Sequence, residues 1–450
     1  MTSPSVSAPT ASEPRFDRLV RRYVERTAKS RALNEAQRRV LAHSRATNRF
    51  NPDWKELVYP IVCDRADGAR VWDVDGNEYV DLTMGLGVTL FGHKPPFVDE
   101  ALRRQLERGN HLAAETPLAG EVAELVAEAT GFERVAIVNT GSEAVLTAVR
   151  LARAVTGRPL IAMFQGSYHG WYDGLLGLRD PDGEVVPPAP GIPHGSVADL
   201  AILDYDDPAA LAALREAGER LAAILVEPVQ SSRIDVQPRA FLAELRRVAD
   251  ETGAALIFDE MITGFRLAHG GAQEWFGVRA DLATYGKILG GGLPIGLVAG
   301  HGRFLDAVDG GAWTYGDDSA PTATRTAFAG TFSRNPLAMA AAQAVLRHLE
   351  AEGPELYDEL NRRAADLAEQ LRGAVERAGA PYRAAVCGSL LSLKGEDAAA
   401  SELLSYHLVD RGIFAWAGGA WFLSTAHGDA ECEEVVAAVE DALVEICAEL

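Results

Sequence analysis

Short apolar runs alternate with amphipathic stretches along the middle of the chain, between residues 132 and 300. The runs are rich in Val, Ile, Leu and Ala, and the stretches between them repeat with a helical period. This alternation predicts an α/β fold with a mainly parallel sheet that helices cover on both faces, and such sheets bind ligands at the carboxyl ends of their strands. The predicted strands are residues 135–138, 160–164, 223–229, 254–259, 282–285 and 297–299.

Other patterns flank this region. Residues 69–82 alternate apolar and polar positions around a central Asp-Gly, which is typical of a β-hairpin. Residues 313–334 are rich in Thr, Gly, Asp and Ala and have weak periodicity, so we expect a functional loop there. A helical pattern resumes at Asn335-Pro336 and dominates to the end, interrupted by short strands near 389–393 and 417–423.

The chain of 450 residues is longer than one hydrophobic core usually supports, so we predict two domains with a cleft between them. We assign residues 1–14, rich in Ser, Thr, Pro and Ala, to a disordered tail. Residues 15–85 are expected to form basic helices and a hairpin that join the smaller domain. Residues 86–335 then form the large ligand-binding domain, and residues 336–450 the C-terminal small α+β domain.

The composition argues against several classes of protein. The net charge of −21 disfavours nucleic acid as a partner, because phosphate backbones demand a positive face. Four scattered cysteines argue against a zinc site or a disulfide framework, so we expect reduced thiols and no metal. The apolar runs are too short to span a membrane, and the N-terminus lacks the pattern of a signal peptide. These features predict a cytoplasmic protein.

One segment has a positive net charge although the chain as a whole is acidic. Residues 15–49 hold ten arginines and Lys29 against three acidic residues, a balance of about +8 that leaves roughly −29 for the rest. Its apolar positions follow helical spacing, which predicts one or two amphipathic helices with a basic face. These helices could pack on the acidic body of the chain or on a second subunit. The alternative is a docking surface for an acidic partner.

A carboxylate and a lysine end two of the predicted strands. Asp259 follows a buried run, and Lys287 follows another and precedes a stretch of glycines. A lysine with a lowered pKa can attach to the aldehyde of pyridoxal-5′-phosphate (PLP) and move a proton between carbons. A carboxylate beside the pyridine nitrogen keeps that nitrogen protonated, so the ring withdraws electrons. Either residue alone could be a surface lysine or a helix cap, but the pair predicts a PLP enzyme in which both are catalytic.

A third motif suits the phosphate of that cofactor. Residues 138–143 turn a strand through Gly141 into an amphipathic helix that stops at Gly157. The N–H groups and the dipole at such a terminus attract an anion, and Ser142 adds a hydroxyl donor. The alternative is an ordinary capped turn from strand to helix.

Two further strand ends carry polar or aromatic residues. Tyr168 lies in an aromatic-rich loop and suits stacking on a flat ring. His169 has no second metal ligand at a suitable spacing, so we interpret it as a positioning residue. Glu227 and Gln230 could bind the ring hydroxyl region or orient Asp259, and a purely structural role stays equally open.

Five motifs in this order and spacing resemble those of class III PLP-dependent aminotransferases, notably of the glutamate-1-semialdehyde aminomutase type. They are Asn139-Thr-Gly-Ser-Glu-Ala144, Ser167-Tyr-His-Gly170, Glu227-Pro-Val-Gln230, Ile257-Phe-Asp-Glu-Met-Ile-Thr-Gly-Phe-Arg266 and Tyr285-Gly-Lys-Ile-Leu-Gly-Gly-Gly292. The resemblance covers nearly the whole chain after Phe50. It implies fold type I, with a mainly parallel seven-stranded sheet in the large domain, and a homodimer whose active sites lie at the subunit interface.

The resemblance also implies residue roles and substrates. The family acts on an amino-acid donor and a carbonyl acceptor. By its pattern Gly141 and Ser142 bind the phosphate, Tyr168 stacks on the ring, Asp259 pairs with the ring nitrogen, Lys287 is the Schiff-base lysine, and Thr331 reaches the phosphate from the partner subunit.

A narrower resemblance links this chain to the aminotransferase domains of hybrid polyketide and nonribosomal peptide synthetases. Among the motifs that carry it are Val58-Tyr-Pro-Ile61, Phe91-Gly-His93, Tyr315-Gly-Asp-Asp-Ser319 and Phe422-Leu-Ser-Thr-Ala-His427. Those domains aminate acyl groups tethered to a carrier protein. The resemblance therefore implies a β-keto acyl acceptor in the biosynthesis of natural products, either free or bound to an acyl carrier protein.

Two alternatives remain beside the aminotransferase. An aminomutase, which moves an amino group within one molecule, would share every cofactor residue named above. A non-catalytic binding module would share the fold, but the presence of both Lys287 and Asp259 argues against it. The sequence also leaves open whether Arg233, Arg325 or Arg334 binds a substrate carboxylate.

Overall fold

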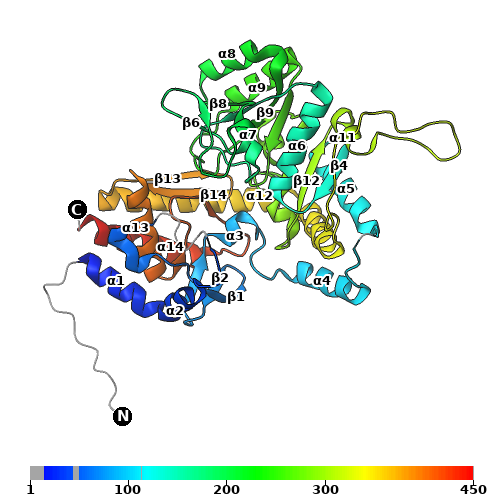
Figure 1. The fold of residues 1–450 in the computed structure, drawn as a ribbon. Helices are drawn as coiled ribbons and strands as arrows, with labels where there is room; N and C mark the ends of the chain where they lie inside the picture. The colour runs from blue at the N-terminus through cyan, green and yellow to red at the C-terminus, as the bar shows by residue number, and fades with distance from the viewer. Residues whose placement is uncertain (1–14, 44–49, 113, 449–450) are drawn as a thin grey trace.

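A computed structural model describes residues 15–43, 50–112 and 114–448 of the chain. A seven-stranded sheet forms the centre of the larger part, in the order β4-β12-β11-β10-β9-β5-β8 (Figure 1). Only β12 runs antiparallel to its neighbours in this sheet. The strands are β4 (Arg134–Val138), β5 (Leu160–Phe164), β8 (Leu200–Leu203), β9 (Leu221–Val226), β10 (Ala255–Asp259), β11 (Leu282–Gly286) and β12 (Gly296–Gly300).

This sheet confirms the predicted α/β fold with a mainly parallel sheet. Six of its strands lie where the apolar runs predicted them, but β8 was not predicted. The prediction also extended β9 to residue 229, whereas the strand ends at Val226. Pro228 has no N–H to donate to a neighbouring strand, which is consistent with the early end of β9.

Helices cover both faces of the sheet, because alternate strand residues point to opposite sides. On one face Val138, Ile161 and Ile257 pack with residues of α6 (Gly141–Thr156) and α11 (Gly302–Asp309). On the other face the strands pack against three helices, α5 (Pro117–Thr130), α9 (Arg239–Thr252) and α12 (Pro336–Ala378). The sheet is therefore buried on both sides, and only its strand ends are free to form a site.

Elements from the two ends of the chain lie together beside the sheet domain (Figure 1). β2 and β3 form the predicted hairpin, and β15 pairs in parallel with β3, so one small sheet combines N-terminal and C-terminal strands. These elements are β1 (Cys63–Asp67), β2 (Arg70–Asp73), β3 (Glu78–Asp81), β15 (Ile413–Phe414), β13 (Tyr382–Cys387), β14 (Leu390–Gly395), β16 (Trp421–Phe422), α13 (Ala398–Asp410) and α14 (Asp429–Cys447). The strand predicted at 417–423 is thus shorter than expected, and β13 was not predicted.

Short elements complete the architecture. Residues 313–334 contain no helix or strand and extend beyond α11 as a long loop, as the sequence predicted (Figure 1). No helix in the described ranges is long and apolar enough to cross a membrane. The remaining elements are η2 (Pro52–Leu57), α3 (Met84–Gly87), α4 (Pro96–Arg108), η3 (Asp173–Leu175), β6 (Leu178–Arg179), β7 (Val185–Val186), α7 (His194–Val197), η4 (Gly218–Arg220), α10 (Gly271–Phe276) and η5 (Lys287–Gly290).

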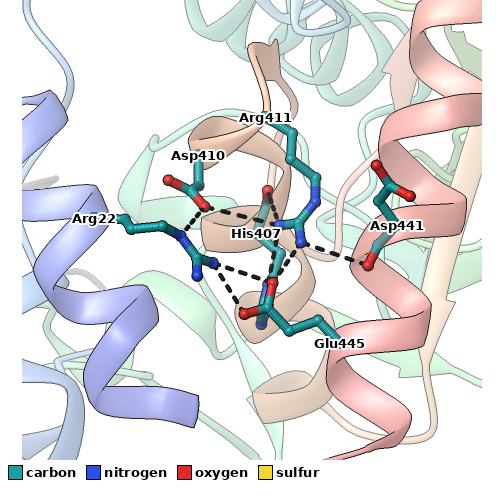
Figure 2. Close-up of polar contacts among 6 residues, drawn as sticks. All are labelled: Arg22, His407, Asp410, Arg411, Asp441 and Glu445. Carbon is teal, nitrogen blue, oxygen red and sulfur yellow. Dashed lines mark hydrogen bonds and ion pairs between the residues drawn. The ribbon is translucent and has the colours of Figure 1, made fainter. Parts of the chain in front are cut away.

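The basic segment forms two helices, α1 (Arg15–Arg26) and α2 (Ala28–Gln37), that pack on the body of the same chain. Arg22 donates from Nε to Asp410 Oδ2 at 2.9 Å and from Nη2 to Glu445 Oε1 at 3.0 Å (Figure 2). Arg411 pairs with the same Glu445, so two arginines share one carboxylate. For Arg22, the structure agrees with packing on the chain's own acidic surface. The predicted tail (1–14), together with Arg45 and Arg49, lies outside the described residues.

Candidate active site

Asp259 lies at the carboxyl end of β10, buried with 4% of its surface exposed. Its Oδ2 lies 2.7 Å from His169 Nδ1, and its Oδ1 accepts hydrogen bonds from Thr284 Oγ1 at 3.0 Å and from the Met261 N–H at 3.2 Å. Thr284 can reach it because β10 and β11 run parallel and pair Asp259 with Thr284. Three neighbours therefore fix the orientation of this carboxylate, and the role of His169 as a positioning residue stays a prediction.

Lys287 follows β11 directly, so it lies at the carboxyl ends of the parallel strands, as Asp259 does. Its φ of 44° lies in the left-handed region, which is uncommon for a residue with a side chain and is typical of functional sites. Burial lowers the pKa of the Lys287 ammonium, although the charges of Asp259 and Glu227 act in the opposite direction. A lowered pKa favours the neutral amine, which is the nucleophilic form of lysine.

The N-terminus of α6 faces the same site. Thr140 and Glu143 form a capping box: the Thr140 hydroxyl accepts from the Glu143 N–H, and the Glu143 carboxylate accepts from the N–H groups of Asn139 and Thr140. Gly141 and Ser142 begin the helix, and their N–H groups belong to the first turn, which an α-helix cannot pair internally. These donors and the helix dipole make the start of α6 a candidate anion site.

Two glycines bring the walls of this anion site close together. A Cβ on Gly141 would lie 2.8 Å from Met261 Sδ, and a Cβ on Gly170 would overlap Ser142. The Trp171 N–H also donates to Ser142 Oγ at 3.3 Å, so the loop after β5 packs directly on the start of α6. Larger residues at either glycine position would fill the space beside the helix terminus.

These groups line one cavity of about 350 Å³ at the carboxyl ends of the parallel strands. It gathers the last residue of β10 and residues that follow β4, β5, β9 and β11, as expected for a parallel sheet. Of the residues that the sequence singled out, it brings together Gly141, Ser142, Tyr168, His169, Glu227, Asp259 and Lys287.

Tyr168 and Glu227 occupy one side of the cavity. Tyr168 is 65% exposed, and its N–H donates to Glu227 Oε2 at 3.0 Å. Burial raises the pKa of the Glu227 carboxyl to about 6, while the charge of His169 acts in the opposite direction. Glu227 therefore holds the Tyr168 loop and also faces the cavity.

Two predicted residues do not line the cavity of this chain. Gln230 is fully buried behind it, where its Nε2 donates to the Gln165 carbonyl at 3.0 Å. Thr331 is exposed on the long loop. The role of Gln230 stays a prediction, and its buried Oε1 has no partner among the described residues. Any contact of Thr331 with a cofactor would have to involve a site other than the cavity described here.

Sequence reasoning missed several residues of the cavity and of its support. Thr284 lies in the predicted strand 282–285 but received no role, although its position opposite Asp259 could have been derived from the parallel pairing of the two strands. Val88 and Leu293 line the cavity with apolar side chains, and no local pattern in the sequence identifies either of them as a site residue. No arginine is among the described residues that line this cavity, and Arg334 is paired with Glu115 at 2.8 and 2.9 Å.

The residues present fit PLP. A lysine amine suits its aldehyde, a buried carboxylate suits its ring nitrogen and the start of α6 suits its phosphate. His169 Nε2 is a buried polar atom that has no partner among the described residues. Such an atom is rarely left unpaired in a folded protein unless a ligand or water completes it.

Comparisons with known proteins identify the family. Residues 52–441 match the family described as Aminotransferase class-III. The glutamate-1-semialdehyde 2,1-aminomutase of Chloroflexus aurantiacus is 38% identical over 406 residues, which cover 85% of this chain and 89% of that protein. A solved structure of a transaminase with PLP bound is 31% identical with a TM-score of 0.83, covering 94% of this chain and 99% of its own. An omega-transaminase from Sphaerobacter thermophilus is 32% identical with a TM-score of 0.82, covering 92% and 97%.

The fold and the cavity therefore define a PLP-dependent enzyme of the transaminase fold. Within that class, the chain belongs to the class III aminotransferases. Its relatives include glutamate-1-semialdehyde aminomutases.

Proposed function

We propose that this protein transfers amino groups with PLP held by Lys287 and Asp259. The observation that carries the proposal is their position at neighbouring strand ends in one cavity, opposite the start of α6. PLP, when bound, withdraws electrons from the substrate carbon so that a C–H proton can leave. The fixed carboxylate of Asp259 favours a protonated ring nitrogen, because an opposite charge nearby stabilises the charged form.

The other residues orient and move groups around this pair. Once the Lys287 amine is no longer bonded to the cofactor, this amine would accept the proton from the substrate and return it. Thr284 and His169 hold the Asp259 carboxylate in place. We assign Gly141 and Ser142 to the phosphate and Tyr168 to the face of the ring. We assign Thr331 to the phosphate of a second copy of the chain, because its side chain is exposed and does not line the cavity of its own chain.

For the reaction itself, we propose an aminomutase that exchanges the amino and carbonyl positions of one small molecule. The support is the 38% identity to a glutamate-1-semialdehyde 2,1-aminomutase over most of both chains. Glutamate-1-semialdehyde is therefore the first substrate to test. Transfer from a separate amino-acid donor to a keto or aldehyde acceptor is the second candidate, and the similarity to an omega-transaminase supports it.

One experiment separates the two. The purified holoenzyme is offered glutamate-1-semialdehyde alone, and separately an amino acid together with an aldehyde. Formation of the isomer with exchanged amino and carbonyl groups, without release of a keto acid, supports the aminomutase. One keto acid released per amine formed in the second assay, with no isomer in the first, would contradict the aminomutase and support the transaminase.

The carrier-bound β-keto acyl acceptor stays a prediction from the narrower resemblance. Docking of an acidic carrier protein would depend on the arginines of the basic segment. One of them, Arg22, forms ion pairs with Asp410 and Glu445 of its own chain. A homodimer remains part of the proposal, because large aromatic side chains of the loop after β5 and of the loop 313–334 are exposed in the single chain. These are Tyr168, Trp171, Trp313, Tyr315 and Phe332.

A further inference from the structure

Arg266 is the largest fully buried side chain of the described protein, and it forms no ion pair with any described residue. Its guanidinium donates only to neutral acceptors: Nη1 to Ser389 Oγ at 3.0 Å and to the Leu423 carbonyl at 3.1 Å, and Nη2 to the Gly87 carbonyl at 3.0 Å. Burial lowers the pKa of this group to about 9. Burying a cation without a carboxylate is costly, so a purely space-filling role does not explain an arginine here.

The Gly87 carbonyl belongs to a strained turn. Met84, Gly85, Leu86 and Gly87 all have positive φ, with values of 44°, 63°, 58° and 91°. Two of these residues carry side chains, for which the left-handed region is unfavourable. Such a turn persists only where its surroundings hold it.

Bonds hold the turn at both ends. At its start, Asp81 Oδ1 accepts from the N–H groups of Thr83 and Met84 at 2.7 and 3.0 Å. At its end, Arg266 binds the Gly87 carbonyl. Phe422 closes the space beneath, since a Cβ on Gly87 would lie 2.6 Å from its ring, and the Arg266 guanidinium carbon lies 5.3 Å from the same ring.

The turn leads directly into the active site. Val88, the next residue, lines the same cavity as Lys287 and Asp259. Arg266 itself does not line the cavity. Arg266 can act on the reaction through the Gly87 carbonyl and the position of Val88, and its positive charge also helps to lower the pKa of Lys287.

We infer that Arg266 is a positioning residue that holds the turn 83–88 and so fixes Val88 in the cavity wall, which sets the size of substrate that fits beside Lys287. The inference rests on the proposed function, because it requires a carbonyl cofactor in this cavity. The bonds to Ser389 and Leu423 anchor the guanidinium to the C-terminal segment. The position of the cavity wall at Val88 thus depends on how that segment packs on the sheet domain.

The test uses the PLP-loaded enzyme and two alkoxyamines of different size, O-methylhydroxylamine and O-benzylhydroxylamine. Both would attack the aldehyde-derived carbon of the cofactor, forming a C=N bond to the alkoxyamine and releasing the Lys287 amine, and the change in cofactor absorbance gives the rate. The quantity compared is the ratio of the two rates in the wild type, Arg266→Met, Val88→Ala and the double variant. Arg158→Met is the matched control, because Arg158 also donates to two backbone carbonyls, Leu221 and Thr252, within the same domain.

Arg266→Met is expected to change the ratio by about tenfold, the size of effect that a small change in an apolar pocket produces. Val88→Ala is also expected to change the ratio of the two rates. In the double variant the ratio should change by less than the product of the two single effects, because both substitutions act on the same cavity wall. Arg158→Met should leave the ratio at the wild-type value. An unchanged ratio in folded, PLP-loaded Arg266→Met, or full additivity with Val88→Ala, overturns the inference.

Two further variants keep the test decisive if Arg266→Met does not fold. Arg266→Lys keeps the charge but reaches fewer acceptors, and Gly87→Ala disturbs the turn through Phe422. If at least one of them folds, it must alter the ratio for the inference to stand. Failure of the proposed function looks different, because the wild type itself would then bind no PLP or fail to react with O-methylhydroxylamine.

Discussion

Asp259 and Lys287 obtain their chemistry from their surroundings more than from their residue types. Both lie near the carboxyl ends of neighbouring strands, where the sheet domain supplies a buried and ordered environment. Asp259 receives three hydrogen bonds or polar contacts before any ligand is considered. Such preorganisation means that little rearrangement is needed when a charged ring nitrogen arrives.

Replacement of Asp259 by Asn tests this at a single side chain. The amide cannot stabilise a protonated ring nitrogen, so we expect PLP to bind while turnover falls by a factor of about a thousand or more. Asp281→Asn is the control, because Asp281 accepts from the Leu256 N–H at 2.8 Å at the opposite end of the same sheet. Turnover and bound PLP are measured in both variants. A rate for Asp259→Asn near that of the control would remove Asp259 from its role.

Thr284→Val tests the support of that carboxylate. It removes the hydroxyl that donates to Asp259 Oδ1 while keeping a β-branched side chain in β11, so we expect turnover to fall about tenfold with small loss of stability. Thr130→Val removes a comparable buried hydroxyl, bonded to the Val126 carbonyl far from the cavity. Equal rates in the two variants would show that Thr284 is only a packing residue.

The sequence predicted the residues of the site better than their exact contacts. The motif at 257–266 identified Asp259, but Arg266 at its end received no role, because nothing local distinguishes a buried arginine from a surface one. Gln230 was placed at the site because it follows a strand, yet it is not among the residues that line the cavity, and its Nε2 donates to the Gln165 carbonyl. Side-chain direction after a strand end depends on tertiary packing, which the sequence pattern does not contain.

At the scale of elements, most strands of the large sheet could be predicted from their apolar runs, but their order and direction could not. β8 has only four residues, at the edge of the sheet, so its signal is short. The sequence of β12 is apolar like those of the parallel strands, because β12 is buried on both faces. Nothing in its composition shows that it is antiparallel. The charge pattern predicted basic helices at the N-terminus, but only the structure identifies Asp410 and Glu445 as the partners of Arg22.

Arg22→Met tests the docking of α1. The arginine side chain is 37% exposed, while its partners Asp410 and Glu445 are mostly buried, so we expect a loss of about 1 kcal/mol in the free energy of unfolding. Arg103→Met, on the exposed face of α4, is the control and should change the stability by less than about 0.5 kcal/mol. Urea unfolding measures both. The account of α1 would be contradicted by an Arg22→Met protein as stable as the control.

His407 gives this cluster a dependence on pH (Figure 2). Burial, with the positive charge of Arg411, lowers the pKa of His407 to about 4, although Glu445 acts in the opposite direction. Below its usual pKa of 6.5 the unfolded chain gains a proton that the folded chain does not. Stability therefore falls as the pH falls from about 6.5 towards 4.

His407→Gln should remove this part of the pH dependence. We expect the wild type to lose about 2 kcal/mol more than the variant in free energy of unfolding between pH 7 and pH 5. Urea unfolding at the two pH values gives the difference for each protein, which cancels any constant effect of the substitution on packing. An identical pH dependence in both would show that His407 does not titrate as described.

At the scale of the whole molecule, our proposal of a homodimer rests in part on the exposed loop 313–334 and its aromatic residues. The proposed role of Thr331 makes this testable by mixing two inactive variants, Lys287→Ala and Thr331→Ala. If Thr331 serves the partner's site, random mixed dimers contain one intact site, and about a quarter of wild-type activity should return. No recovery from dimers that demonstrably exchange subunits would place Thr331 in the site of its own chain or outside it.

The central claim is that PLP is bound covalently by Lys287, and the most direct measurement is borohydride reduction followed by peptide mass analysis. The chain has only five lysines, so Lys29, Lys55, Lys94 and Lys394 serve as internal controls. We predict that reduction fixes one PLP per chain on the peptide that contains Lys287, and that Lys287→Ala carries none. Recovery of the reduced cofactor on another lysine, or on no lysine of a protein purified with PLP, would contradict this account.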